Sequence, residues 1–165
     1  EGCDDISPVL FRLTYNGYGM RKFQRDRADE VNGKFYSCPL IRLPEIYLNI
    51  AEAMNELGKA TTKDEFGNDA YDYINMVRNR VNMPDLTTAK AAPGRELREA
   101  IRHERRVELG LEFDRFYDLV RWGIAKEVLH AAGKTNYQDK NALLPLPQTE
   151  IDKSKGVLVQ NPDYQ

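Results

Sequence analysis

Residues 43–57 have the sequence LPEIYLNIAEAMNEL, the clearest helical pattern in the chain. At about 100° per residue, the apolar side chains fall on one face and the polar ones fall opposite. The apolar face is Leu43, Ile46, Tyr47, Ile50, Met54 and Leu57, and the polar face is Glu45, Asn49, Glu52 and Glu56. Pro44 suits the first helical turn and Gly58 suits the C-terminal cap. The stretch predicts an amphipathic helix packed against other helices.

Three further segments have helical periodicity. We expect helices over residues 68–81, 93–110 and 114–131, separated by loops and ended by Pro84 and Gly133. The second segment has an inner face of Ala70, Tyr73, Ile74, Val77 and Val81. The last segment has one face of Phe113, Phe116, Tyr117, Val120, Ile124 and Val128, with Leu119 and Trp122 on the other. Two successive helix pairs predict an all-α fold, an αα-superhelix of tetratricopeptide-like helix pairs with irregular loops.

The helical part is flanked by irregular sequence on both sides. We expect residues 1–41 to form an irregular segment packed on the helices, residues 42–133 to form the two helix pairs, and residues 134–165 to form an extended tail. The 165 residues suit one domain. Because the sequence opens without a cap or a targeting segment, we interpret it as part of a larger protein.

Composition excludes several classes of function. The formal net charge is -2, so no basic field is present to attract nucleic acid. No apolar run is long enough to span a membrane. Cys3 and Cys38 have no metal-ligand spacing. They could pair with each other, but two free thiols are the favoured interpretation, because two cysteines make no disulfide framework in a domain of this size.

Two acidic residues of the third helical segment face inward. On a helical wheel, Glu104 and Glu108 fall on the same face as the apolar Leu97 and Ile101. Buried carboxylates are costly unless they are paired. Arginines on or near the predicted inner faces supply partners, namely Arg42, Arg78, Arg105, Arg115 and Arg121.

Two interpretations of this acidic pair compete. Side chains at i and i+4 lie about 6 Å apart, which is compatible with two catalytic carboxylates of a glycoside hydrolase. The alternative is a set of buried ion pairs that fixes the register of the helices. We favour the ion pairs, because arginine neighbours favour the ionised carboxylate whereas hydrolysis needs a protonated acid. Glu99 and His103 are at i and i+4 and could share a metal, but no second such pair exists, so an exposed helix pair is the favoured interpretation. We expect no catalysis, no metal and no cofactor.

Five stretches resemble a known family when they are taken in order. They are LIRLPEIYLNIAEA at residues 40–53, ERRVEL at 104–109, RFYDLVRWG at 115–123, LPLPQTEI at 144–151 and QNPDYQ at 160–165. Together they are similar to the C-terminal portion of the SusD/RagB family, over about residue 18 to the end of the chain. The resemblance implies the helical fold of that family.

The resemblance also implies a function. Members are lipoproteins on the outward-facing surface of the outer membrane of Bacteroidetes, held by a lipid anchor that would lie outside this chain. They capture oligosaccharide or peptide and pass it to a SusC-like, TonB-dependent transporter. The expected partners are therefore a glycan and such a transporter. The alternative is a helical-repeat adaptor that binds a protein partner through its concave face.

The resemblance assigns a structural role to six charged residues at motif positions. We expect them to form an ion-pair framework made of Arg42, Arg78, Glu104, Glu108, Asp118 and Arg121. Ligand contacts are expected elsewhere, because sugar capture uses aromatic faces and a few hydrogen-bond donors.

The best local candidates for such ligand contacts lie near the start of the chain. They are Tyr15, Asn16, Tyr18 and Arg21, although the tyrosines could instead pack the loop onto the helices. Asn136 and Tyr137 are further candidates. We expect Trp122 to belong to the core, because it lies in the middle of a predicted helix.

Overall fold

The computed structural model describes residue 22 and residues 39–164. They divide between two compact units, with the boundary after Leu111. The described residues contain helices and no strands, which confirms the predicted all-α class. Among the described residues, no helix is both long enough and apolar enough to cross a bilayer.

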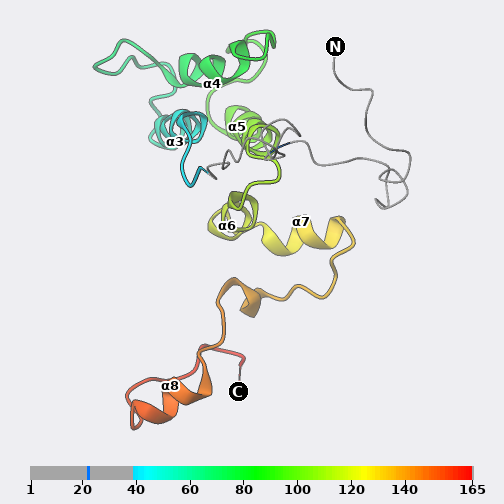
Figure 1. Ribbon diagram of the computed structural model, residues 1–165. Helices are drawn as coiled ribbons and strands as arrows, with labels where there is room; N and C mark the ends of the chain where they lie inside the picture. The colour runs from blue at the N-terminus through cyan, green and yellow to red at the C-terminus, as the bar shows by residue number, and fades with distance from the viewer. Residues whose placement is uncertain (1–21, 23–38, 165) are drawn as a thin grey trace, which may run out of the picture. The chain divides into compact units, whose positions relative to one another are not determined.

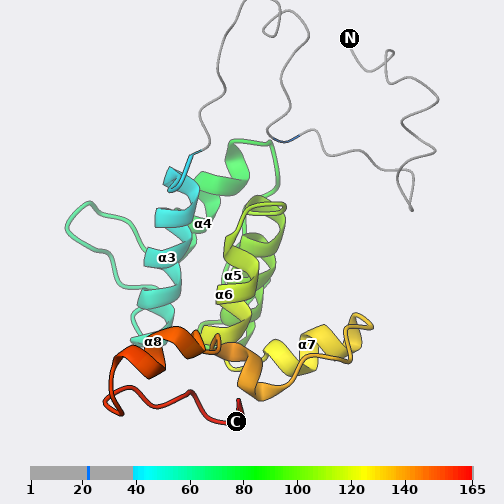
Figure 2. The ribbon, with the colours of Figure 1, turned by 60° about the horizontal axis from the view of Figure 1, so that its bottom comes forward.

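The first unit is built on three helices. These are α3 (Leu43–Glu56), α4 (Ala70–Asn79) and α5 (Arg95–Glu108). Helix α3 lies beside both α4 and α5 (Figure 1, Figure 2). The hydrophobic core lies among these helices and is formed by Leu48, Ala51, Ala60, Ala70, Tyr71, Tyr73, Ile74, Val77, Leu97 and Ile101. The three predicted helices are thus confirmed, with shorter bounds for the second and third.

The predicted apolar face of α3 is confirmed only in part, since Tyr47, Ile50 and Met54 pack against the core. Leu43 and Leu57 are 59% and 71% exposed, whereas the fully buried positions are Leu48, Ala51 and Asn55. The reason is that α3 has neighbours on two sides. Its polar side also contacts α5, where Arg98 forms two hydrogen bonds of 2.6 Å with Glu56.

Helix α4 begins at a capping box. The Asp69 carboxylate accepts hydrogen bonds from the backbone N–H groups of Tyr71 and Asp72 at 2.9 and 3.1 Å. The Asp72 carboxylate accepts one from the Asp69 N–H at 2.9 Å. Such a box satisfies donors that the first helical turn leaves without partners. Val81 was predicted on the inner face of this helix, but the helix ends at Asn79 and Val81 is half-exposed, so that assignment is wrong.

Asp69→Ala is expected to lower the free energy of unfolding by about 1 kcal/mol, because the N-cap acceptor is lost. Urea unfolding followed by circular dichroism measures this loss. Asp85→Ala removes an exposed carboxylate from the α4–α5 loop and serves as the control. Equal losses for the two variants would contradict the capping role.

The α4–α5 loop, residues 80–94, is held by side chains of the preceding helices. Asn75 donates to the Leu86 carbonyl at 3.0 Å and accepts from the Leu86 N–H at 2.8 Å. Asn55 makes the same two-bond bridge to Gly94, at 2.9 and 2.8 Å. The Tyr71 hydroxyl donates to the Ala91 carbonyl at 2.7 Å. All of these bonds reach backbone atoms of the loop, so they hold the loop backbone and do not involve the loop side chains.

The second unit contains four short helical segments. They are α6 (Asp114–Arg121), α7 (Ala125–Ala131), the 3-10 helix η1 (Asp139–Ala142) and α8 (Gln148–Lys153). The predicted single helix over residues 114–131 is therefore wrong, since α6 and α7 are separate.

The break between α6 and α7 has a local cause. Gly123 has a φ of +69°. The N–H of Gly123 bonds to the Val120 carbonyl and the N–H of Ile124 bonds to the Leu119 carbonyl. This is the Schellman arrangement that ends a helix at a left-handed glycine. Trp122, predicted in mid-helix, thus lies at the end of α6 and is only partly buried.

The C-terminal segment is partly helical rather than wholly extended, because α8 lies within it. An extended stretch precedes α8 and is held by the last residues of the chain. Gln160 makes a two-bond bridge to the backbone of Leu146 at 2.8 and 2.9 Å. Asn161 donates to the Leu144 carbonyl at 2.6 Å, and the Tyr164 hydroxyl donates to the Leu143 carbonyl at 2.9 Å.

Candidate functional site

A groove runs between the start of α3 and the end of α4. It has a volume of about 660 Å³. Its lining residues are Arg42, Leu43, Pro44, Tyr47, Met76, Val77 and Arg80. The lining therefore combines apolar side chains, one aromatic ring and two arginines, a composition common in small-molecule sites.

The Tyr47 ring contacts the ring of a second tyrosine, Tyr73 of α4. The ring centroids of Tyr47 and Tyr73 are 5.7 Å apart at an interplanar angle of 39°. The Tyr73 hydroxyl in turn donates to the Asp64 carboxylate. This bond, with further ones from backbone N–H groups, lowers the pKa of Asp64, and the same carboxylate raises the pKa of Tyr73. The hydrogen bond is thus favoured with Asp64 ionised and Tyr73 protonated, and it helps to orient the Tyr73 ring that contacts Tyr47.

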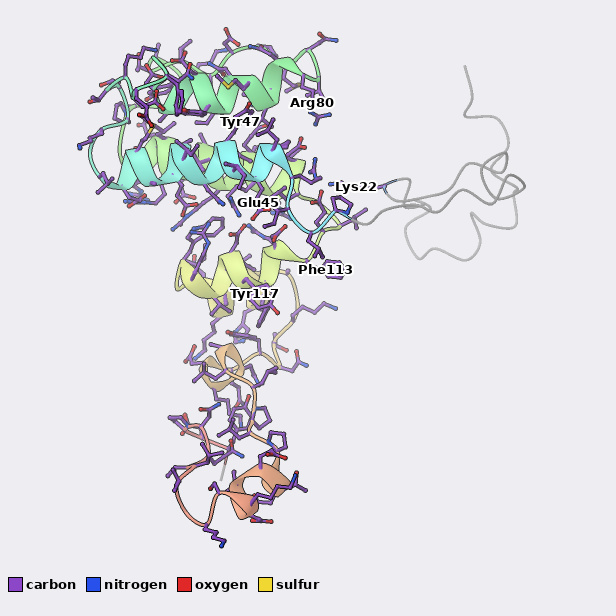
Figure 3. All side chains as sticks on the ribbon, turned by 60° about the vertical axis from the view of Figure 1, so that its left-hand side comes forward. Lys22, Glu45, Tyr47, Arg80, Phe113 and Tyr117 are labelled. Carbon is purple, nitrogen blue, oxygen red and sulfur yellow. The ribbon has the colours of Figure 1, made fainter. Side chains whose placement is uncertain are left out.

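The two arginines of the groove meet at one carboxylate of α5. Arg42 Nη2 lies 3.1 Å from Glu108 Oε1, and Arg80 Nη2 lies 2.7 Å from Glu108 Oε2. Lys22 Nζ donates to the backbone carbonyls of Glu108 and Gly110 at 2.8 and 3.0 Å. Cations at the C-terminal end of a helix satisfy its last carbonyls and complement its dipole. Lys22 and Arg80 lie at the same end of the unit (Figure 3).

A second ion pair lies deeper between α4 and α5. Arg78 Nη1 is 2.6 Å from Glu104 Oε2, and Arg78 Nε also donates to the Pro84 carbonyl at 2.9 Å. Four of the six residues expected to form the framework are therefore brought together in two ion-pair groups of the first unit. The other two, Asp118 and Arg121, form an ion pair of 2.9 Å within the second unit.

The ion pairs of Glu104 and Glu108 argue against the interpretation of these residues as catalytic carboxylates. Both carboxylate oxygens of Glu108 are engaged by arginines, and Glu104 is held by Arg78. Such carboxylates act as hydrogen-bond acceptors and are poorly suited to donating a proton to a leaving group. Glu99 pairs with Arg102 rather than with His103. In the part of the chain that the structure describes, no cluster of three or more His, Cys, Asp or Glu residues could hold a metal ion.

The residues predicted to contact ligand lie outside the described part of the chain. These are Tyr15, Asn16, Tyr18 and Arg21, and the same holds for Cys3 and Cys38. Of the further candidates, Asn136 is exposed, and the Tyr137 ring is 6.3 Å from that of Phe116 in an edge-on arrangement. Sequence reasoning missed the α3–α4 groove, because it placed Tyr47 in the core and gave Arg80 no role.

The comparisons with known proteins identify the family. The model of the SusD family matches residues 8–164. The chain belongs to the SusD family. SusD-like protein P2 of Formosa agariphila is 32% identical over 144 residues, which cover 81% of this chain and 27% of that protein. This SusD-family chain therefore spans about a quarter of the length of that relative.

Two solved structures of SusD type are similar to this chain. A laminarin-binding SusD-like protein is 36% identical with a TM-score of 0.56, and the match covers 76% of this chain and 23% of that one. Surface glycan-binding protein A from Bacteroides thetaiotaomicron is 33% identical with a TM-score of 0.54, covering 72% of this chain and 23% of that one. The helical arrangement described above is therefore that of the SusD family.

Proposed function

We propose that this SusD-family chain belongs to a cell-surface protein that binds oligosaccharides without cleaving them. The observation that carries the proposal is the relationship to the laminarin-binding protein and to surface glycan-binding protein A. The ion pairs of Glu104 and Glu108 support a binding role over a hydrolytic one, because arginines already engage these two carboxylates.

Isothermal titration of the chain with laminari-oligosaccharides, galactans and xylans tests this function. We expect saturable binding of at least one of them, with a Kd of about 1 mM or lower, which corresponds to about 4 kcal/mol. We also expect no new reducing ends after prolonged incubation. Absence of binding across the panel, or release of reducing ends, would count against the proposal.

The same titration tests the ligand residues predicted near the start of the chain. The double substitution of Tyr15 and Tyr18 by alanine is expected to weaken binding about tenfold or more, because stacking surface is lost. Phe66→Ala removes an exposed aromatic ring from the α3–α4 loop and is the matched control. Equal effects of both variants would contradict the assignment of Tyr15 and Tyr18.

We further propose that the protein sits on the outward-facing surface of the outer membrane, through a lipid anchor outside this chain. There it passes its glycan to a SusC-like, TonB-dependent transporter. Affinity purification from detergent-solubilised outer membranes is expected to recover such a transporter together with the protein. Recovery of a different protein partner alone would favour the helical-repeat adaptor instead.

A further inference from the structure

We propose that the α3–α4 groove binds an anionic sugar residue, one that carries a uronate carboxylate or a sulfate ester. This inference rests on the proposed glycan-binding function and adds the chemical class of the sugar and the place where it binds.

The charges of the groove favour an anion. Its lining contains two arginines, Arg42 and Arg80, and no carboxylate among the described residues that line it. The Arg80 side chain is 55% exposed and uses Nη2 for Glu108. A guanidinium has five N–H donors, so Arg80 retains donors for a second acceptor. Arginine favours carboxylate, phosphate and sulfate groups, because its planar fork can donate two parallel hydrogen bonds.

The nearby carboxylates of Glu108 and Glu45 do not compete with an anionic ligand for the groove. The Glu108 side chain is 9% exposed, and both its oxygens already accept from arginines. Glu45 lies on the same helix as Tyr47 but on the opposite side of the helical wheel. Figure 3 shows Tyr47 on the side of α3 toward α4 and Glu45 on the other side.

The apolar part of the groove suits a sugar ring. Tyr47 offers a ring that is held by its contact with Tyr73. Leu43 and Met76 are both exposed beside it and can contact the C–H face of a pyranose. An aromatic face together with a few fixed donors is the usual composition of a sugar site. The volume of about 660 Å³ exceeds that of one sugar ring and leaves room for a neighbouring residue of an oligosaccharide.

Calorimetry with matched ligands tests the inference on the whole chain. The probes are hexagalacturonate, its fully methyl-esterified form, a sulfated galactan hexamer and the unsulfated hexamer. We expect at least one anionic probe to bind about tenfold or more tightly than its neutral counterpart, the size expected for a charge-assisted hydrogen bond. That preference should weaken as salt rises. Comparing hexagalacturonate with the sulfated galactan hexamer, each against its neutral counterpart, shows which anionic group the groove accepts.

Arg80→Gln is expected to abolish the preference for the anionic probe. Arg106→Gln removes an exposed arginine of α5 that does not line the groove, and it should keep the preference. Circular dichroism checks the fold of both variants. If Arg80→Gln unfolds the chain, Arg80→Lys, which keeps the charge but loses the fork, should reduce the preference partially.

The outcomes separate this inference from the proposed function. Equal binding of charged and neutral probes overturns the anionic site and leaves glycan binding intact. A preference that neither Arg80 variant alters overturns the location in the α3–α4 groove. Absence of binding by all four of these probes overturns the inference, and the proposed function is overturned only if the laminari-oligosaccharides, galactans and xylans also fail to bind.

Discussion

Glu104→Ala is expected to lower the free energy of unfolding by about 3–5 kcal/mol, because it leaves a partly buried arginine without its counter-ion. Glu104 is only 8% exposed and lies 2.6 Å from Arg78 Nη1. The same arginine also holds the Pro84 carbonyl, so its displacement would disturb the α4–α5 loop. Urea unfolding followed by circular dichroism gives the loss directly.

The matched control for this variant is Glu99→Ala. Glu99 lies on the same helix and also pairs with an arginine, but its side chain is 62% exposed. The expected loss is therefore below about 1 kcal/mol, the usual range of surface ion pairs. Similar losses for Glu104→Ala and Glu99→Ala would contradict the structural role of Glu104. A stable Glu104→Ala variant that lost a hydrolytic activity would instead support the glycosidase interpretation.

Asn55→Asp is expected to destabilise the chain by about 2–4 kcal/mol at neutral pH. Asn55 is buried and both donates to and accepts from the backbone of Gly94. An ionised carboxylate can accept but cannot donate, so it would face the Gly94 carbonyl without a hydrogen between them. A protonated carboxyl can do both, so the bridge should re-form at low pH.

The sign of this pH effect follows from linkage. Burial beside a carbonyl raises the folded-state pKa of the introduced carboxyl above its unfolded value of about 3.9. The protonated form therefore stabilises the fold below about pH 4, and this contribution is lost as pH rises through the folded-state pKa. Unfolding of Asn55→Asp and the wild type should be compared at pH 3.5 to 7.5.

Two controls complete the comparison. Asn55→Ala should show a similar loss at neutral pH without recovery in acid, since alanine cannot bond to Gly94 at any pH. Asn136→Asp, at an exposed position, should match the wild type throughout. A loss for Asn55→Asp that does not change with pH would refute the two-bond bridge.

The sequence predicted the helices of the first unit well, because periodicity and caps agree there. Gly58 follows α3 with a φ of +69°, as its position after the apolar pattern indicated. The face that α3 buries was harder to predict. A helical wheel assumes one buried side, whereas α3 has neighbours on two sides, so Asn55 is buried while Leu57 is exposed.

The break between α6 and α7 was missed for a different reason. Apolar residues continue through it at helical spacing, with Val120 and Ile124 in phase with Val128. Periodicity therefore favoured one helix, although Gly123 carried the same local signal as Gly58. A glycine inside an apolar pattern can end a helix or be tolerated within it, and only the backbone geometry decides.

The candidate site could be predicted only in part. The inward position of Glu104 and Glu108 followed from helical spacing, and arginines were the evident partners. The pairing itself depends on how three helices approach one another, which residue spacing does not give. Arg80 was overlooked because the predicted inner face of residues 68–81 was made of apolar positions and did not include it, whereas the structure ends α4 at Asn79.

The bridges to the α4–α5 loop have a consequence for which amino-acid substitutions this loop can accept. The Asn75 side-chain amide bonds to main-chain atoms of Leu86, and the Tyr71 hydroxyl bonds to the main-chain carbonyl of Ala91. Side chains of the helices thus help to set the path of the loop, while exposed loop side chains such as Thr87 and Thr88 take no part in those bridges. Such side chains can be exchanged while the backbone keeps its course. The loop can therefore present different exposed side chains on an unchanged backbone.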